Sequence, residues 1–201
     1  MKCFLPFFLI ISVLLFSGCA TDNGGDSLNL KGKKVIFVVA PSDFRDEELF
    51  HPKEVLEANG ASTAIASLSK GALQGVMGGT AQATLSLNDV KAENFDAIVF
   101  VGGSGAQVYF NNSKAMALAR EFLSAGKITS AICIAPSILA NAGLLKGKKA
   151  TCFSSEAANL KAKGATYTGK AVEVDGLLVT ADGPSSAKAF GNEIAKLLSK
   201  S

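Results

Sequence analysis

Cys133 stands at the end of a short apolar run, where the sequence predicts a turn between a strand and a helix. Residues 128–132 are apolar and partly β-branched, a pattern typical of a buried strand. Pro136 occupies what would be the first helical position, and Gly143 suits a left-handed helix end. A thiol on such a turn lies near the positive end of a helix dipole, and backbone N–H groups of the turn could hold an oxyanion. The alternative is a small buried cysteine that only packs in the core.

The remaining pattern alternates strands with helices. Strands are expected at 34–40, 62–67, 97–101, 128–132 and 150–153, with a strand pair over 171–180 and an irregular glycine-containing hairpin over 72–85. Helices are expected at 46–59, 113–125 with Ser113 as its N-cap, 137–142, 156–163 and 185–199. Such alternation predicts an α/β fold in which a mostly parallel sheet carries helices on both faces.

Three of these segments should meet at one edge of the sheet. They are the acidic start of the helix over 46–59, the loop that begins at Gly102, and the Cys133 turn. Each follows the carboxyl end of a predicted strand, which is where ligands bind in open parallel sheets. The convergence favours a reactive Cys133 over a cysteine that only packs.

The N-terminus predicts export. Lys2 precedes an apolar run over 4–16 that is too short to span a bilayer comfortably, and small residues then lead to Cys19. The pattern resembles a bacterial or archaeal lipoprotein signal. We therefore expect a signal peptide over 1–18, lipidation at Cys19, a flexible tether over 19–31 and one domain over 32–201. The alternative is an uncleaved N-terminal anchor, and either arrangement predicts a membrane-anchored protein of the cell envelope facing away from the cytoplasm.

Charge and metal-ligand content limit the other classes of function. The formal net charge is +3, and Arg occurs only at 45 and 120, so no nucleic-acid partner is expected. His51 is the single histidine, and Cys133 and Cys152 are the two domain cysteines, so no metal site is expected, although the two thiols could pair as a disulfide. The loop after Ala40 lacks the glycine pattern of a dinucleotide site, and no cofactor is predicted.

Several motifs together identify the chain as similar to the ThiJ/PfpI superfamily. They are the run from Phe44 to Pro52, Val-Gly-Gly at 101–103, Ala-Ile-Cys-Ile-Ala-Pro at 131–136, and Asp-Gly-Leu-Leu-Val-Thr at 175–180 followed by Gly-Pro at 183–184. The resemblance covers residues 33–198. It implies a flavodoxin-like α/β sandwich, a homodimer, and a cysteine at a strained strand-to-helix elbow.

The resemblance also implies partners for Cys133. In that family an acid on the first helix hydrogen-bonds the cysteine, and Glu48 matches its position, with Glu47 as the alternative. The backbone N–H groups of Gly103 and Ile134 match the family's oxyanion pocket. From these matches we expect Glu48 to hold its proton and Cys133 to be ionised near neutral pH, as a coupled pair.

Two departures from the family concern the general base. PfpI-type proteases carry His directly after the cysteine, where this chain has Ile134, so peptidase activity is not expected. The Parkinsonism-associated branch, credited with glyoxalase and deglycase activity, has a His after the following strand, where residues 151–154 contain none. His51 lies three residues after Glu48 and could share its helix face or face a dimer partner.

Three hypotheses follow for the function. The first is a glyoxalase- or deglycase-like enzyme that uses Cys133 and Glu48 on a small reactive carbonyl compound. The second is a protein of the oxidative-stress response whose Cys133 oxidises reversibly. The third is a noncatalytic binding or chaperone-like lipoprotein in which the cysteine elbow is idle.

Overall fold

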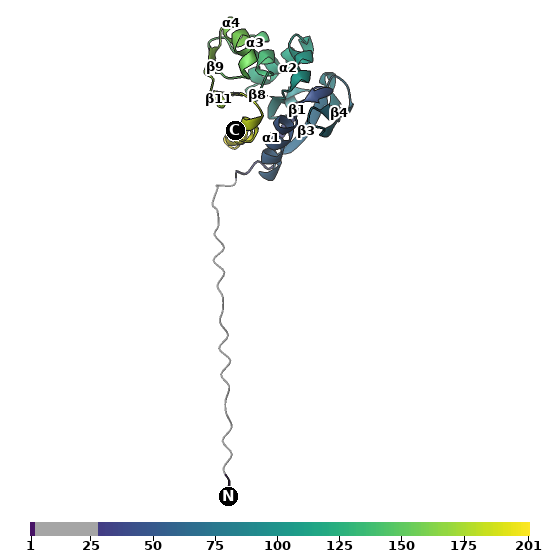
Figure 1. Ribbon diagram of the computed structural model, residues 1–201, viewed down its shortest axis with the longest axis vertical. Helices are drawn as coiled ribbons and strands as arrows, with labels where there is room; N and C mark the ends of the chain where they lie inside the picture. The colour runs from purple at the N-terminus through teal and green to yellow at the C-terminus, as the bar shows by residue number, and fades with distance from the viewer. Residues whose placement is uncertain (3–27) are drawn as a thin grey trace.

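A seven-stranded sheet lies at the centre of the computed structural model, which describes residues 1–2 and 28–201 (Figure 1). Its order is β11-β12-β8-β7-β1-β3-β6. The strands are β1 (Lys34–Val38), β3 (Ser62–Ser67), β6 (Leu85–Ser86), β7 (Ala97–Phe100), β8 (Ile128–Ile132), β11 (Val172–Asp175) and β12 (Leu178–Ala181). Neighbouring strands are parallel except β11 and β12, which form an antiparallel hairpin at one edge.

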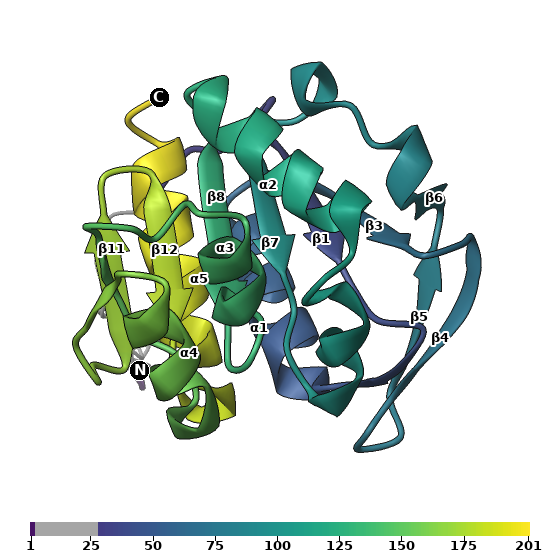
Figure 2. The ribbon, with the colours of Figure 1, turned by 90° about the horizontal axis from the view of Figure 1, so that it is seen from above.

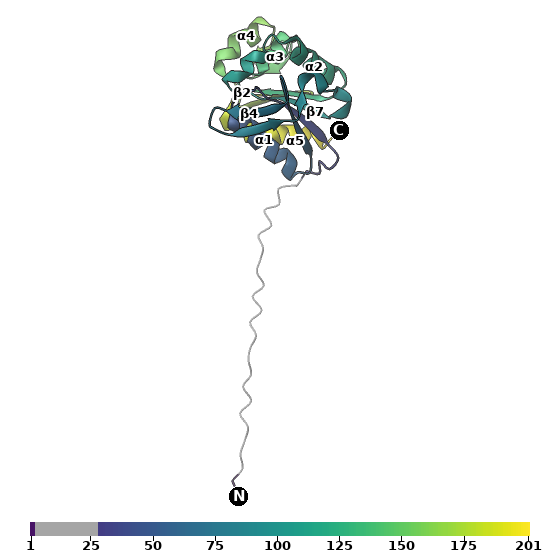
Figure 3. The same cartoon turned by 90° about the vertical axis from the view of Figure 1, so that its right-hand side faces the viewer.

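Helices cover both faces of this sheet. They are α1 (Asp46–Ala58), α2 (Ser113–Ser124), α3 (Pro136–Asn141), α4 (Ala157–Ala162) and α5 (Ala187–Leu198). Figures 2 and 3 show α1 and α5 together on one face and α2, α3 and α4 on the other. Strands β7 and β8 are buried along their whole length, as expected for apolar runs covered on both sides. The predicted flavodoxin-like α/β sandwich is confirmed.

Two local predictions differ from the structure. The N-cap of α2 is Asn112 rather than Ser113, because the Asn112 side chain accepts the N–H of Ala115 at 3.0 Å. The strand predicted over 150–153 is short: β9 (Lys149–Ala150) pairs only with β10 (Thr166–Tyr167). On the side away from β10, the N–H of Thr151 donates to the side-chain Oγ1 of Thr180 in β12 at 2.9 Å, so no backbone pair with β12 forms there.

The predicted hairpin over 72–85 is present and belongs to a second sheet. Strands β4 (Gly71–Gly75) and β5 (Thr80–Ala83) are antiparallel, and β4 also pairs with β2 (Ser42–Phe44), which directly precedes α1. This small sheet, with the order β2-β4-β5, places the hairpin turn next to the beginning of α1. The turn therefore lies at the same end of the molecule as the predicted site.

The N-terminal predictions concern residues that are largely outside the described part. The predicted signal peptide, beyond its first two residues, and Cys19 are not described. Leu28 and Leu30 pack against the core, and the N–H of Leu30 donates to the carbonyl of Asn59 at 2.8 Å, just before the predicted start of the domain at residue 32. Within residues 1–2 and 28–201, no helix is long and apolar enough to cross a membrane.

Candidate active site

Cys133 occupies a strained elbow between β8 and α3. Its φ of 64° is left-handed, a conformation that costs a non-glycine residue about 1–3 kcal/mol. Two hydrogen bonds hold it there: its N–H donates to Ala181 at 2.9 Å, and its carbonyl accepts the N–H of Phe153 at 2.7 Å. The side chain is 8% exposed and lines a pocket. The predicted strand-to-helix turn is confirmed, and its geometry presents the sulfur rather than burying it completely.

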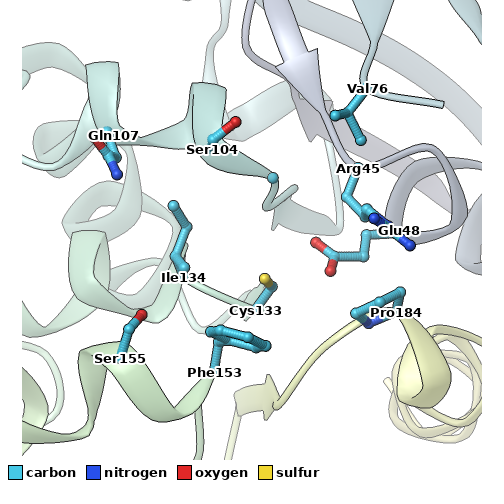
Figure 4. A pocket seen from close by; sticks show the side chains of 11 residues that line it. Arg45, Glu48, Val76, Ser104, Gln107, Cys133, Ile134, Phe153, Ser155 and Pro184 are labelled. Carbon is cyan, nitrogen blue, oxygen red and sulfur yellow. The ribbon is translucent and has the colours of Figure 1, made fainter. Parts of the chain in front are cut away.

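Glu48 reaches the cysteine from the first turns of α1. The residue is fully buried, and Figure 4 shows its carboxyl group directed toward the sulfur of Cys133. Gly102 makes this approach possible, since a Cβ at that position would lie 2.4 Å from Oε2 of Glu48 and 2.6 Å from Cβ of Cys133. Glu47, the alternative acid, instead binds Nε of Arg45 at 2.9 Å and is partly exposed. Of the two acids, Glu48 is the one beside the thiol.

Burial controls the proton on Glu48. Desolvation raises its pKa from 4.5 to about 7, and the Cys133 thiol, Arg45 and the Gly102 N–H offset only part of that rise. Neither carboxyl oxygen has a hydrogen-bond partner of ordinary geometry within the described residues. A carboxyl group with a pKa near 7 can take or give a proton at neutral pH.

The thiol responds to the same surroundings. Burial, and then the negative charge of Glu48, raise the pKa of Cys133 to about 12, while the N–H groups of Gly103 and Ile134 lower it. The expected thiolate at neutral pH is therefore disfavoured in this pocket, because burial outweighs the stabilisation from those two N–H groups. Protonation of Glu48 removes the repulsion between its carboxylate and a thiolate at Cys133. At neutral pH the thiol is therefore protonated, and Glu48, with a pKa near 7, carries the negative charge whenever the pair is ionised.

A pocket of about 380 Å³ opens over Cys133 (Figure 4). Its apolar walls come from four different parts of the chain: Val76, Ile134, Phe153 and Pro184. Polar groups at its edge belong to Arg45, Ser104, Gln107 and Ser155. Gly103 also lines it, so the two N–H groups predicted as an oxyanion site, those of Gly103 and Ile134, both face the sulfur. The space suits a small ligand with one polar end.

Comparison with known proteins places this geometry in a family. The model of the DJ-1/PfpI family matches residues 33–197, which include α1, the Gly102 loop and the elbow. The chain belongs to the DJ-1/PfpI family.

Relatives and solved structures agree with that assignment. An uncharacterised protein of Methanocaldococcus jannaschii is 42% identical over 199 residues, covering 98% of this chain and 97% of that protein. A deglycase of Pyrococcus horikoshii is 34% identical over 165 residues, covering 82% of this chain and 99% of the deglycase. The crystal structure of a ThiJ/PfpI domain protein from Brachyspira murdochii superposes with a TM-score of 0.83 at 34% identity, covering 85% of this chain and 99% of that one.

This member of the DJ-1/PfpI family has no imidazole in its pocket. The single histidine, His51, is exposed on α1 and does not line the cavity. Ile134 follows the cysteine, and Phe153 fills the position near the elbow after β9. The two places where this chain lacks a histidine of the family, Ile134 and the segment that contains Phe153, thus both line the pocket. Glu48 is the buried acid that lines the pocket beside Cys133.

The sequence left open a disulfide between Cys133 and Cys152, which the structure does not contain, and predicted no metal site. Cys133 and Cys152 are both free thiols, and Cys152 is 1% exposed and does not line the pocket over Cys133. Within the described residues, no group of three or more His, Cys, Asp or Glu side chains is arranged to hold a metal ion.

Asp46 does not line the pocket but holds one of its walls in place, a role that no sequence motif indicated. Its carboxylate accepts the N–H groups of Met77 at 2.8 Å and Gly79 at 2.6 Å, which ties the β4–β5 turn to the start of α1. Glycine is required at 75 and 79, because a Cβ at either position would lie within 2.5 Å of that carboxylate. The turn carries Val76 into the pocket wall. The glycines of the hairpin were the only sequence signal of this contact.

Asp46→Asn should loosen the Val76 wall of the pocket. The substitution replaces a charged acceptor of two N–H groups and should destabilise the protein by about 1–3 kcal/mol. Amide hydrogen exchange at Met77 and Gly79 should speed up more than exchange in β7. Glu54→Gln is the matched control, since it removes an exposed acid of α1 that forms no ion pair within residues 1–2 and 28–201. Equal protection of the turn in both variants would contradict the assigned role.

Proposed function

We propose that this protein is a cysteine-dependent enzyme acting on small reactive carbonyl compounds or their adducts, in the manner of a glyoxalase or deglycase. The observation that carries the proposal is the pairing of Cys133 with a fully buried Glu48 whose pKa is about 7. A relative named as a deglycase supports it. An acid of that pKa can replace the missing histidine as the proton carrier.

The proposed chemistry begins with addition of the thiol to an aldehyde. As Sγ of Cys133 bonds to the carbonyl carbon, the C=O π bond breaks and the thiol proton passes to Glu48. The oxygen, now negatively charged, receives hydrogen bonds from the N–H groups of Gly103 and Ile134 and then a proton from Glu48. The product at this stage is a neutral hemithioacetal, and Glu48 is a carboxylate again.

With a 2-oxoaldehyde, the adduct can proceed without an external oxidant. Glu48 removes the proton from the carbon bonded to sulfur, and the electron pair passes through a C=C bond to the neighbouring carbonyl oxygen, giving an enediolate. That oxygen takes the proton of the adduct's hydroxyl group as a C=O bond forms at the carbon bonded to sulfur, and Glu48 returns its proton to the neighbouring carbon, which gives the thioester of a 2-hydroxy acid. Water then cleaves the thioester, releases the hydroxy acid and restores the thiol. The net reaction adds one water molecule to the aldehyde.

The direct test is methylglyoxal consumption by the full chain, with lactate measured as the product. Lactate formation that is lost when Cys133 is alkylated would support the proposal. Methylglyoxal loss without lactate, or lactate formation unaffected by alkylation, would contradict it. Peptidase activity is not proposed, because the PfpI-type proteases that this chain resembles carry a histidine directly after the cysteine, where this chain has Ile134.

A redox function is the second candidate, and the missing imidazole is the observation that favours it. Without that base, slow turnover would leave Cys133 available to peroxide, and Glu48 could hydrogen-bond the oxidised sulfur. Mass spectrometry after peroxide treatment distinguishes the two functions. Oxidation of Cys133 in a protein that forms no lactate would support the redox function.

The proposed location is the cell envelope, with Cys19 lipid-modified after removal of residues 1–18. The M. jannaschii relative matches 98% of the chain, and hence most of the N-terminal segment, whereas the P. horikoshii deglycase matches 165 residues. The extra segment therefore sets this chain apart from that deglycase, and its pattern resembles a lipoprotein signal.

Intact mass of the membrane-extracted protein tests this location. The expected mass corresponds to a chain that begins at Cys19 and carries acyl groups. Cys19→Ala should leave the N-terminal segment uncleaved and unacylated. An unmodified chain that begins at Met1 in the wild type would contradict the proposal.

The assembly proposed for this family member is a homodimer. The resemblance of the whole domain to the family supports it. Sedimentation of the detergent-solubilised full chain should show a species of two chains, and a single-chain species at micromolar concentration would contradict it.

A further inference from the structure

A second cavity lies beside the pocket that contains Cys133. Its volume is about 370 Å³, and it shares two wall residues, Phe153 and Pro184, with the first pocket. Phe153 is 47% exposed, and its N–H donates to the carbonyl of Cys133 at 2.7 Å. Phe153 and Pro184 form the wall between the two cavities, and the Phe153 bond holds this wall to the cysteine elbow. A ligand that lies over Phe153 can therefore occupy both cavities.

The second cavity differs from the first in its charge. Asp182 is the only charged residue that lines it, and no Lys, Arg or His does so within the described residues. The hydroxyl of Ser186 donates to Oδ1 of Asp182 at 2.5 Å, which orients the carboxylate. The hydroxyl-bearing residues Ser154, Tyr167 and Ser185 complete its polar lining.

Tyr167 already interacts with a cation of the protein. Nζ of Lys161 lies 5.4 Å from the centroid of its ring, so one face of the ring is occupied. Recognition of a further positive charge in this cavity therefore depends mainly on the carboxylate of Asp182, assisted by the hydroxyl groups.

We propose that the second cavity is a subsite for a cationic group, an ammonium or guanidinium, carried by the molecule whose carbonyl carbon reaches Cys133. Asp182 is its anchor, and Phe153 and Pro184 form the passage between the two parts of the ligand. The inference rests on the proposed function for its substrate, but binding in the second cavity does not depend on turnover. The subsite selects positively charged adducts over neutral aldehydes of the same size.

The experiment measures binding without chemistry, on the full chain carrying Cys133→Ser. The probes are Nα-acetyl-lysine methylamide and its uncharged analogue Nα-acetyl-norleucine methylamide, titrated by NMR. The lysine probe should bind at least about tenfold more tightly, and its affinity should fall with added salt. The amide signals that move should include those of residues 153, 167 and 182–185.

Asp182→Asn provides the decisive variant. Asn keeps an oxygen that accepts the Ser186 hydroxyl, so the local fold is retained while the charge is lost. The preference for the lysine probe should fall to about twofold or less, whereas Glu54→Gln, an exposed acid on α1, should keep it. Equal binding of the two probes, an unchanged preference in Asp182→Asn, or signal changes confined to the side of Ile134 would overturn the subsite. Failure of lactate formation in the wild type would instead contradict the proposed function and leave this binding result valid.

Discussion

Cys133→Ala should reduce carbonyl consumption by at least about 10³-fold in kcat/KM, because it removes the only sulfur among the described residues that line the pocket. No other group there can replace it. Ser104 has no basic partner, and Glu48 is a weaker nucleophile than sulfur toward a carbonyl carbon. The measurement is initial-rate lactate formation by the full chain at pH 7.

The control for this prediction is the second buried thiol. Cys152→Ala removes a cysteine that does not line the pocket over Cys133. It should retain most of the activity, apart from a modest loss of stability caused by the small cavity it leaves. If the two variants lose activity equally, general damage to the fold rather than loss of the nucleophile would explain the result for Cys133→Ala.

Glu48→Gln should separate activity from stability. As the proposed proton carrier, Glu48 should contribute about 10²–10⁴-fold to the rate, and Gln cannot replace it. The same substitution should make the protein more stable at pH 8, because it removes a buried carboxyl group that ionises there. Opposite changes in rate and stability are the signature of a residue retained for chemistry.

The pH dependence of this stability gain follows from the pKa of Glu48. Its pKa is about 7 in the folded protein against 4.5 for the free group, so the folded state binds the proton more tightly. That contribution is fully present below about pH 4.5 and is lost as the pH rises through 7, a change of about 3 kcal/mol. Glu48→Gln should therefore match the wild type near pH 4.5 and exceed it by about that amount at pH 8.

Urea unfolding at the two pH values measures this difference. Glu47→Gln is the control, and its effect on stability should have the opposite sign. Hydrogen bonding lowers the pKa of the Glu47 carboxyl group, and its charge is paired with Arg45. The substitution should slightly destabilise the protein at pH 8. A stability gain in Glu48→Gln that is equal at both pH values would show that burial of the carboxylate is not its cause.

The reactivity of Cys133 provides a second readout of the same variant. The negative charge of Glu48 is the second largest cause of the raised thiol pKa, after burial. Removing that charge should lower the apparent pKa seen in the rate of alkylation against pH. An unchanged alkylation profile would mean that Glu48 is not the partner of Cys133.

The sequence by itself predicted a mostly parallel sheet with helices on both faces, and it placed Cys133 on the turn after a strand. The apolar β-branched runs of β1 and β7 have few alternatives to burial between two layers of helices, since neither alternates apolar with polar residues. Strand β8 is buried in the same way, although it carries Thr129 and Ser130. Pro136 directly after a strand predicts a helix start, and a cysteine between them must lie on the turn. These are local signals, and the structure confirms them.

The tertiary structure decided which groups meet at that turn. Glu47 and Glu48 are neighbours in a helix, where successive side chains point in directions about 100° apart, and composition cannot say which faces the sheet. The resemblance to a family favoured Glu48, and the space left by Gly102 is the physical reason that it reaches Cys133. The bonds from the hairpin to Asp46 join residues more than thirty positions apart and leave no periodic pattern.

Burial was the other quantity that only the tertiary structure could supply. From the sequence, the helix after Cys133 predicts a thiolate, because a dipole and free N–H groups are the visible features. In the structure α3 has six residues and the thiol is almost enclosed, so desolvation dominates its pKa and that of Glu48. Local sequence carries propensity and charge, but the loss of water around a group depends on every element that packs over it.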